Sequence, residues 1–308
     1  MAGHTLLTGG AGFIGSTLAR HLLAAGHRLV VLDKLTYAGN RENLQGLDLE
    51  LVVGDVCDKD LVRELVADSE VVIHAAAESH VTRSHQNAAP FIRSNIEGSR
   101  VIVQSAADAG VPHCIHLSTD EVFGAAAVGE RFGFYDTHRP SNAYAASKAS
   151  AEAFLQVIRK RDGYPFSLVR MTNNYGPRQH EEKAIPCWIN HALQGRPIPI
   201  HGQGTAERDW LHVDDFAQGI LKILTHGVPG ETHHFSGGNS RSNREVAEMI
   251  ARICGAPSIQ EGPERPGQDA RYALNDDETR TKLDWQPTQN FEGNLVALVA
   301  AARKKEAS

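Results

Sequence analysis

The chain of 308 residues is 41% hydrophobic and 22% charged, and it carries a formal net charge of −6. This length fits one large or two modest domains, and the mild acidity disfavours a general nucleic-acid-binding protein. The longest apolar run, residues 295–302, is too short to span a bilayer. Four scattered cysteines without a CxxC pair argue against a disulfide framework or a structural zinc site. We expect a cytoplasmic protein without a metal ion.

Short β-branched runs alternate with helical patterns in the first half of the chain, which is typical of βαβ units around a parallel sheet. The predicted strands span residues 5–8, 28–33, 49–55, 71–76, 114–119 and 166–172. The clearest helical patterns span residues 13–25, 89–109 and 142–160. Together they predict an α/β fold with a doubly wound, Rossmann-type parallel sheet.

The composition of the sequence changes after the sixth predicted strand. Prolines and glycines become denser between residues 176 and 204, and again between residues 255 and 267. We therefore predict a nucleotide-binding domain over residues 1–165 and a smaller α/β substrate-binding domain over residues 166–308. Residues 213–225 are expected to return to the first domain.

A glycine-rich turn follows the first predicted strand. Gly9, Gly12 and Gly15 are spaced three residues apart, between that strand and a predicted helix. Glycines at such positions permit a tight turn and let the backbone approach a pyrophosphate, which the helix N-terminus stabilises. An ordinary glycine-rich turn has the same composition, so the loop alone is a weak signal.

Carboxylates end the next two predicted strands. Asp33 follows Gly15 by 18 residues, where it can accept hydrogen bonds from both ribose hydroxyls of adenosine and would repel a 2′-phosphate. NAD is therefore favoured over NADP, although Lys34 and Arg41 weaken that preference. Asp55 could reach the adenine amino group, but a capping or turn aspartate is an equally good interpretation.

Tyr144 and Lys148 lie four residues apart in a predicted helix, and so on one face of it. A free tyrosine titrates near ~10 and is a poor base at neutral pH. A nearby ammonium and the cationic nicotinamide of an oxidised cofactor would both favour the phenolate. This spacing is common on surface helices, but together with the glycine loop it indicates a dehydrogenase-type site.

Two adjacent acids follow the fifth predicted strand. Thr119 can donate to a substrate oxygen beside the phenol, and Asp120 and Glu121 come next. Adjacent acids in a cleft repel each other, so one tends to keep its proton while the other stays ionised. Because a regular strand directs neighbours to opposite faces, a joint role needs a bend in the backbone. A solvated acidic loop is the alternative interpretation.

These residues resemble the extended short-chain dehydrogenases/reductases, and among them the NAD-dependent nucleotide-sugar 4,6-dehydratases. The likeness extends over nearly the whole chain. The motifs that carry it, besides the glycine loop, are DKLTYAGN at 33–40, AAESHV at 76–81, STDEVFG at 118–124, NNYGP at 173–177, EK at 182–183, RDWL at 208–211 and RPG at 265–267.

The resemblance implies a reaction on an NDP-hexose such as dTDP-glucose. Tyr144 would take the C4 hydroxyl proton while hydride passes to bound NAD, with Thr119 polarising the C4 oxygen. Lys148 would hold the nicotinamide ribose and lower the pKa of the phenol. Glu121 would then remove the acidified C5 proton, and Asp120 would protonate the departing C6 hydroxyl. Hydride return to C6 leaves a 4-keto-6-deoxy sugar and regenerates NAD.

The resemblance also implies residues that hold the two ligands, and a homodimer that pairs the helices after the fourth and fifth strands. Those implied for NAD are Gly9, Gly12, Phe13, Ile14, Gly15, Asp33, Lys34, Thr36, Asp55, Val56, Ala75, Ala77, Ser94, Tyr144 and Lys148. Those implied for the nucleotide-sugar are Ser79, Thr119, Asn173, Lys183, Arg208, Asn243 and Arg265. Arginines suit a diphosphate because a guanidinium can bind two oxygens at once.

The chain departs from the usual family pattern at several positions. Thr82 replaces an aspartate, and His201 replaces an aromatic residue expected beside the nucleotide base. Gln268 replaces the histidine that usually follows Arg-Pro-Gly. Asn142 and Ala143 replace the Ser-Pro pair before the tyrosine. These changes leave the nucleotide base open among dTDP, UDP, CDP and others, and they leave the hexose open as well.

Two other functions are compatible with part of the pattern. A nucleotide-sugar 4-epimerase or a uronate decarboxylase needs the tyrosine, the lysine and Thr119, but not the acid pair. A non-catalytic NAD-binding protein would need neither Tyr144 nor Lys148. The acid pair therefore favours elimination of water.

Overall fold

The computed structural model describes residues 3–255 and 258–306; residues 1–2, 256–257 and 307–308 of the two predicted domains lie outside them. At its centre is a seven-stranded parallel sheet in the order β10-β6-β5-β4-β1-β2-β3. The strands are β1 (His4–Thr8), β2 (Leu29–Asp33), β3 (Glu50–Val53), β4 (Ser69–His74), β5 (His113–Thr119), β6 (Ser167–Met171) and β10 (Thr232–Phe235). The predicted Rossmann-type fold is confirmed.

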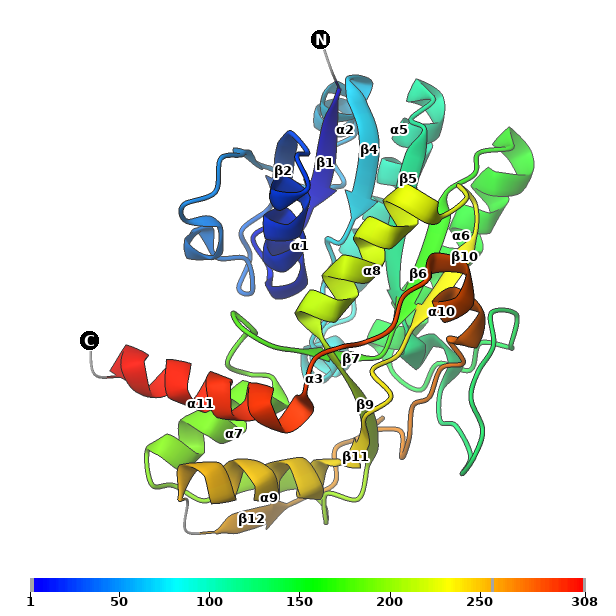
Figure 1. The fold of residues 1–308 in the computed structure, drawn as a ribbon. Coiled ribbons are helices and arrows are strands. Elements are labelled where there is room, and N and C mark those ends of the chain that lie inside the picture. The colour runs from blue at the N-terminus through cyan, green and yellow to red at the C-terminus, as the bar shows by residue number, and fades with distance from the viewer. Residues whose placement is uncertain (1–2, 256–257, 307–308) are drawn as a thin grey trace.

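Helices cover both faces of this sheet (Figure 1). One face carries α1 (Phe13–Ala24) and α8 (Val213–His226), and the other carries α2 (Lys59–Ala67), α5 (Ser99–Ala109) and α6 (Ala143–Asp162). Successive strand residues serve opposite cores: Leu7 is buried with α1 and α8, whereas Leu6 is buried with the other three helices. Strands that are buried on both faces appear in the sequence as continuous apolar runs, which is why the sequence predicted them.

A smaller lobe lies below the carboxyl ends of the sheet in Figure 1. It contains a three-stranded sheet, β11-β9-β7, and the strand pair β12-β8. Its elements are β7 (Asn173–Tyr175), α7 (Ala184–Leu193), β8 (Ile198–His201), β9 (Glu207–His212), β11 (Ser240–Ser242), α9 (Asn243–Cys254), β12 (Ile259–Gly262) and α11 (Phe291–Glu306). Tyr175, Trp210 and Phe291 pack edge to face or tilted in its core.

The topology differs from a division of the chain at residue 165. β6 and β10 follow that boundary in the sequence, yet both pair within the seven-stranded sheet. α8 packs on α1, with the His21 ring 3.1 Å from the Asp214 carboxylate. α10 (Asp277–Leu283) packs on β10 and α8. Several later segments therefore belong to the larger lobe.

The predicted helix over residues 89–109 is divided into three parts. A short α4 (Ala89–Phe91), with Pro90 in its first turn, leads into a π-helical segment (Ile92–Gly98) and then into α5. π-helical turns often occur at functional sites. The remaining short elements are η1 (Arg41–Leu44), α3 (Val81–Gln86) and the 3-10 turn η3 (Asp120–Phe123).

None of the helices in the described part of the chain is both long and apolar enough to cross a membrane. Within residues 3–255 and 258–306, no three histidine, cysteine or acidic side chains cluster so as to hold a metal ion.

Candidate active site

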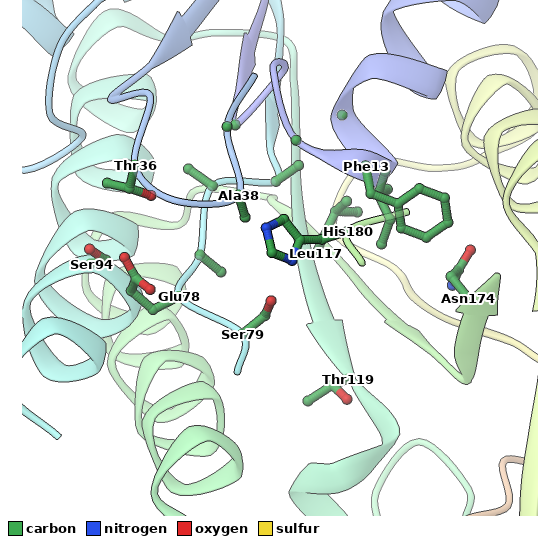
Figure 2. A pocket seen from close by; sticks show the side chains of 18 of the residues that line it. Phe13, Thr36, Ala38, Glu78, Ser79, Ser94, Leu117, Thr119, Asn174 and His180 are labelled. Atoms are coloured by element: carbon green, nitrogen blue, oxygen red, sulfur yellow. The ribbon is translucent and has the colours of Figure 1, made fainter. Parts of the chain in front are cut away.

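A pocket opens at the carboxyl ends of β1, β2, β4 and β5 and continues toward the smaller lobe. Every residue predicted to bind NAD lines it. In Figure 2, Phe13 stands on one side of this space and Thr36 and Ser94 on the other. The residues predicted for the sugar and nucleotide that also line it are Ser79, Thr119, Asn173 and Lys183.

The glycine loop leaves room for a ligand at the start of α1. Gly9 has a φ of +70°, and a Cβ on Gly15 would lie 2.1 Å from the Gly9 carbonyl oxygen. Gly12 precedes the helix, and its residue type offers no side chain to cap the first amides. These amides face a pocket lined by the loop, which suits a pyrophosphate.

Asp33 is the last residue of β2, where it is buried against the glycine loop. Its Oδ2 accepts a hydrogen bond of 2.9 Å from the Ala11 amide, and its Oδ1 accepts one of 2.8 Å from the Leu35 amide. The carboxylate is therefore fixed by backbone donors. Each oxygen keeps a second lone pair, so the group can still accept from a ribose hydroxyl.

Asp55 is held by basic neighbours. Lys34 Nζ lies 2.8 Å and Arg93 3.2 Å from its Oδ2, and the Cys57 amide donates to its Oδ1. Burial alone would raise the pKa of Asp55, but these donors, with Lys34 the strongest, lower it to about 2. Lys34 is thus engaged by a carboxylate, which reduces its availability for a 2′-phosphate.

Tyr144 and Lys148 are both in the first two turns of α6 and line the pocket. Burial raises the pKa of the Tyr144 phenol, as do the charges of Glu121 and Asp120, while a hydrogen bond with Thr119 lowers it. Lys148 Nζ donates to the Leu117 carbonyl oxygen at 2.6 Å. Burial lowers the pKa of Lys148 to about 8, although the Glu152 carboxylate opposes this shift.

The backbone bends at the acid pair, as a joint role requires. β5 ends at Thr119, and a 3-10 turn starting at Asp120 brings both carboxyl groups to the pocket. Burial, followed by the charge of Glu121, raises the pKa of Asp120 to about 8. Thr119 donates to its Oδ1 at 3.1 Å, and within the described residues its buried Oδ2 has no hydrogen-bond partner. The raised pKa favours the protonated form of Asp120 next to the carboxyl group of Glu121.

Arg208, Asn243 and Arg265 lie beyond this pocket, in the smaller lobe. The Arg208 guanidinium stacks 4.4 Å above the Tyr272 ring and donates to the Asp269 carbonyl oxygen at 3.0 Å. Burial lowers the pKa of Arg265; the charge of Glu121 opposes this and that of Arg208 adds to it. The buried Nε of Arg265 lacks a hydrogen-bond partner in the part of the chain that the structure describes. Two cations close enough to repel each other, one with an unpaired donor, suit an anion.

Asn243 begins α9 and is placed near these arginines through the backbone. Its amide donates to the Ala206 carbonyl oxygen at 3.0 Å, two residues before Arg208. The neighbouring Arg241 is paired with Arg208 in the β11–β9 ladder. The backbone of Asn243 therefore lies beside β9, the strand that carries Arg208.

Asn95 is a buried residue that the sequence interpretation missed. It lies in the π-helical segment and exchanges hydrogen bonds of 2.8 and 2.9 Å with the backbone of Glu78. It also donates to Ser147 Oγ at 2.8 Å, and Ser147 donates to the Tyr144 carbonyl oxygen. Asn95 thus connects the pocket loop after β4 to the helix of Tyr144. No local signal marked it, because its role depends on the π-helical register.

Glu182 was also missed, although its motif was noticed. It joins the start of α3 to the loop before α7, with its carboxylate 3.4 Å from His80, 3.5 Å from Arg83 and 3.7 Å from His180 in its own loop. Arg83 stacks 3.7 Å above the Tyr37 ring. The polar and aromatic residues concentrated around positions 37, 80–83 and 180–182 were the sequence signal that could have indicated this cluster.

Comparison with known proteins agrees with this geometry. Residues 5–236 match the protein family described as NAD dependent epimerase/dehydratase. The chain belongs to this family. The dTDP-glucose 4,6-dehydratase of Streptomyces niveus is 38% identical to it, over 98% of this chain and 93% of the relative. The low-salt glycan biosynthesis protein Agl12 of Haloferax volcanii is 40% identical, over 96% of each chain.

Solved structures of the epimerase/dehydratase family share the fold. DesIV, a dTDP-glucose 4,6-dehydratase from Streptomyces venezuelae with NAD and TYD bound, has a TM-score of 0.95 at 37% identity, over 99% of this chain and 98% of its own. The UDP-glucose 4-epimerase of Thermotoga maritima with UDP-glucose has a TM-score of 0.93 at 26% identity, over 98% and 99%. Both reactions thus occur on this scaffold, so the side chains of the site must decide between them.

Proposed function

We propose that this protein is an NAD-dependent hydro-lyase that converts an NDP-hexose, dTDP-glucose or a related NDP-glucose, into the NDP-4-keto-6-deoxyhexose. It would be a nucleotide-sugar 4,6-dehydratase, serving deoxysugar biosynthesis. Relatives named dTDP-glucose 4,6-dehydratase at 36–38% identity support this assignment, and the acid pair is the observation that carries it.

The acid pair supplies what elimination needs and epimerisation does not. The pKa of Asp120, raised to about 8, favours its protonated form at neutral pH, and its Oδ2 has no hydrogen-bond partner among residues 3–255 and 258–306. Glu121 lines the same pocket. We assign removal of the C5 proton to Glu121 and protonation of the leaving C6 hydroxyl to Asp120 Oδ2. Tyr144 would accept the C4 hydroxyl proton, and the Thr119 hydroxyl would turn from Asp120 Oδ1 to donate its one proton to the C4 oxygen.

The residues present fit NAD. The glycine loop and the first amides of α1 would bind the pyrophosphate, Asp33 the adenosine ribose, Asp55 and Val56 the adenine edge, and Lys148 the nicotinamide ribose. Asp33, which would repel a 2′-phosphate, and Lys34, which is already paired with Asp55, support NAD over NADP. When bound, NAD supplies a reversible two-electron acceptor at C4. The other NAD-lining side chains would shape the pocket: Phe13, Ile14, Thr36, Ala75, Ala77 and Ser94.

The nucleotide-sugar would extend from this pocket into the smaller lobe. Ser79 and Asn173 would contact the substrate from the pocket side, and the buried Asn173 Oδ1 has no hydrogen-bond partner among the described residues. Lys183, Arg208 and Arg265 would neutralise the diphosphate, with Asn243 nearby. We accordingly propose a division of labour in which the seven-stranded sheet holds NAD and the smaller lobe holds the nucleotide. The base and the hexose substituents stay open among dTDP, UDP, CDP and related nucleotides.

We further propose a homodimer and a cytoplasmic location. Ile92, Phe154 and Val157 are each more than half exposed, on the π-helical segment and on α6. Exposed apolar side chains on two helices that pack together support an interface between copies there. The four cysteines are free thiols, which supports a reducing compartment.

One experiment tests the proposed reaction. The purified protein is incubated with a panel of NDP-hexoses in deuterated water, without added cofactor. We expect a product lighter by one water before label exchange, with deuterium at C5. A product of unchanged mass with inverted C4 would instead identify a 4-epimerase, and loss of carbon dioxide from a uronate would identify a decarboxylase. No turnover of any substrate, with NAD bound, would favour a binding protein.

A further inference from the structure

Asn142 contacts the acid pair from the start of the helix that carries Tyr144. It is buried, and its Oδ1 accepts a hydrogen bond of 2.8 Å from the Ala145 amide, which caps α6. Its Nδ2 donates to Glu121 Oε2 at 3.1 Å. One side chain therefore does two things: it caps the N-terminus of the helix that carries Tyr144, and it orients the carboxylate of Glu121, 21 residues earlier in the chain.

The two oxygens of Glu121 have different surroundings. Besides Asn142, the Tyr272 hydroxyl lies 3.5 Å from Oε2. Within the described residues, no hydrogen bond reaches Oε1. Because both neutral donors approach one oxygen, the carboxylate is held with its other oxygen free in the pocket. That is the arrangement a base needs, since the oxygen that takes a proton must not already be occupied.

The charged and titratable groups facing Glu121 come from five parts of the chain, and one of them is Tyr272, whose pKa is raised by burial and then by the charge of Glu121. That charge also raises the pKa of the adjacent Asp120 and of the Tyr144 phenol. Lys183 and Arg265 face it as cations from the loops before α7 and after β12. Asn142 is a neutral donor among them, so it can fix the position of Glu121 without competing for a proton.

Asn142 also sits beside the loop expected to bind the nucleotide. The preceding Ser141 donates to Asp269, and a Cβ on Gly267 would lie 3.3 Å from the Ser141 carbonyl oxygen. Arg208, which stacks on Tyr272, donates to the Asp269 backbone. Both donors to Glu121 therefore adjoin the proposed diphosphate site. Asn142 follows Ser141, which contacts the loop around Gly267, and Tyr272 stacks with Arg208.

We propose that Asn142 is a positioning residue for Glu121: its amide holds Oε2 so that Oε1 faces C5 of the sugar. This assignment rests on the proposed dehydratase reaction. It predicts that the donor, and not only the helix cap, is needed for proton removal. The Ser-Pro pair usual in the family lacks such an amide, so this chain has its own means of orienting the base.

Asn142→Asp separates the two roles. Aspartate has the same shape and is as good an N-cap as asparagine, but it replaces the donor with a carboxylate that repels Glu121. We expect kcat for water loss to fall about 100-fold or more, with KM changed less than about threefold. Hydrogen bonds to charged groups correspond to losses of roughly 10–100-fold. Oxidation at C4, followed by the near-ultraviolet absorbance of reduced cofactor in a single turnover, should persist.

Asn142→Ala provides the comparison, because it removes both the cap and the donor. We expect it to lower the thermal midpoint and to slow water loss about 10- to 100-fold. If the cap alone mattered, the aspartate variant would match the wild-type protein and only the alanine variant would be slow. That result would overturn the assignment, as would C5 deuterium incorporation at the wild-type rate in Asn142→Asp.

The wild-type protein is assayed first, so that the two proposals fail in different ways. If the wild type inverts C4 without losing water, the dehydratase function itself is wrong. If the wild type loses water and Asn142→Asp does so at the same rate, the function stands and the positioning role is wrong.

Discussion

The ammonium of Lys148 donates a hydrogen bond of 2.6 Å to the carbonyl oxygen of Leu117, inside the sheet. This contact fixes the lysine against the end of β5, two residues before Thr119. The charge is thereby held near the position proposed for the nicotinamide ribose. Burial and the charge of Glu121 raise the pKa of the Tyr144 phenol, so the proposed proton transfer from the C4 hydroxyl would gain from a cation held nearby.

We predict that Lys148→Met, which keeps the length of the side chain without its charge, slows C4 oxidation by about 10²–10⁴-fold. Single-turnover absorbance of reduced cofactor measures this step. Lys160→Met is the matched control, because Lys160 is exposed at the other end of α6; it should behave as wild type. An oxidation rate within twofold of wild type in Lys148→Met would contradict the proposed role.

Asp120 should act as an acid only while it holds its proton. Because its pKa in the folded protein is raised to about 8, water loss should decline as the pH rises through about 8. Asp120→Asn should slow water loss by about 10²–10⁴-fold while leaving C4 oxidation in place. The dependence of kcat for water loss on pH tests this, and an unchanged kcat above pH about 9 would argue that another group is the acid.

The same group should affect stability. The folded state keeps the Asp120 proton between pH about 4 and 8, whereas the unfolded state releases it, so the stability of the wild-type protein is lost as the pH rises through this window. Asp120→Asn lacks this penalty. Its unfolding free energy relative to wild type should grow by roughly 3–4 kcal/mol from pH 5 to pH 8. Urea unfolding of both proteins at the two pH values provides the measurement; a constant difference would show that Asp120 is ionised.

Glu121→Gln should separate oxidation from elimination. Glutamine keeps the shape but cannot accept the C5 proton, so we expect water loss to fall by about 10²–10⁴-fold and C5 exchange in deuterated water to stop. Partial reduction of the bound cofactor should continue. The control is Glu64→Gln, on the exposed side of α2. Wild-type C5 exchange in Glu121→Gln would assign the base elsewhere.

Gly15→Ala should weaken retention of NAD. The added Cβ would lie 2.1 Å from the Gly9 carbonyl oxygen, so the loop would have to move. Overpacking of this size costs about 1–3 kcal/mol, and we expect NAD to bind at least about tenfold more weakly. Gly133→Ala is the control, since its Cβ would meet only the Asp136 carboxylate, at 3.7 Å. The NAD content of the purified proteins, measured after release by denaturation, distinguishes the two.

The sequence predicted local structure better than the partners of each element. The apolar run of β6 identified a strand, but a strand buried on both faces carries no mark of which sheet it joins, so the boundary at residue 165 separated it from β5, its neighbour. The π-helical segment was predicted as ordinary helix because its 7 residues make fewer than two turns, too few to show a different apolar period.

The site shows the same division. The spacing of Tyr144 and Lys148 places them on one face of α6, and the resemblance identified the pocket residues. The contact of Asn142 with Glu121 depends on how a turn after β5 meets the start of α6, and that of Tyr272 joins positions 151 residues apart. Such contacts are set by tertiary packing, which no local pattern encodes.

The path of the chain limits how this scaffold can be rearranged. It leaves the seven-stranded sheet after β6, returns through α8 and β10, and departs again at β11. A chimera made at one crossover point would therefore transplant strands of the larger lobe together with parts of the smaller lobe. Exchange of substrate preference between relatives is accordingly better attempted by grafting single loops, such as the one around Gly267, than by exchanging halves of the gene.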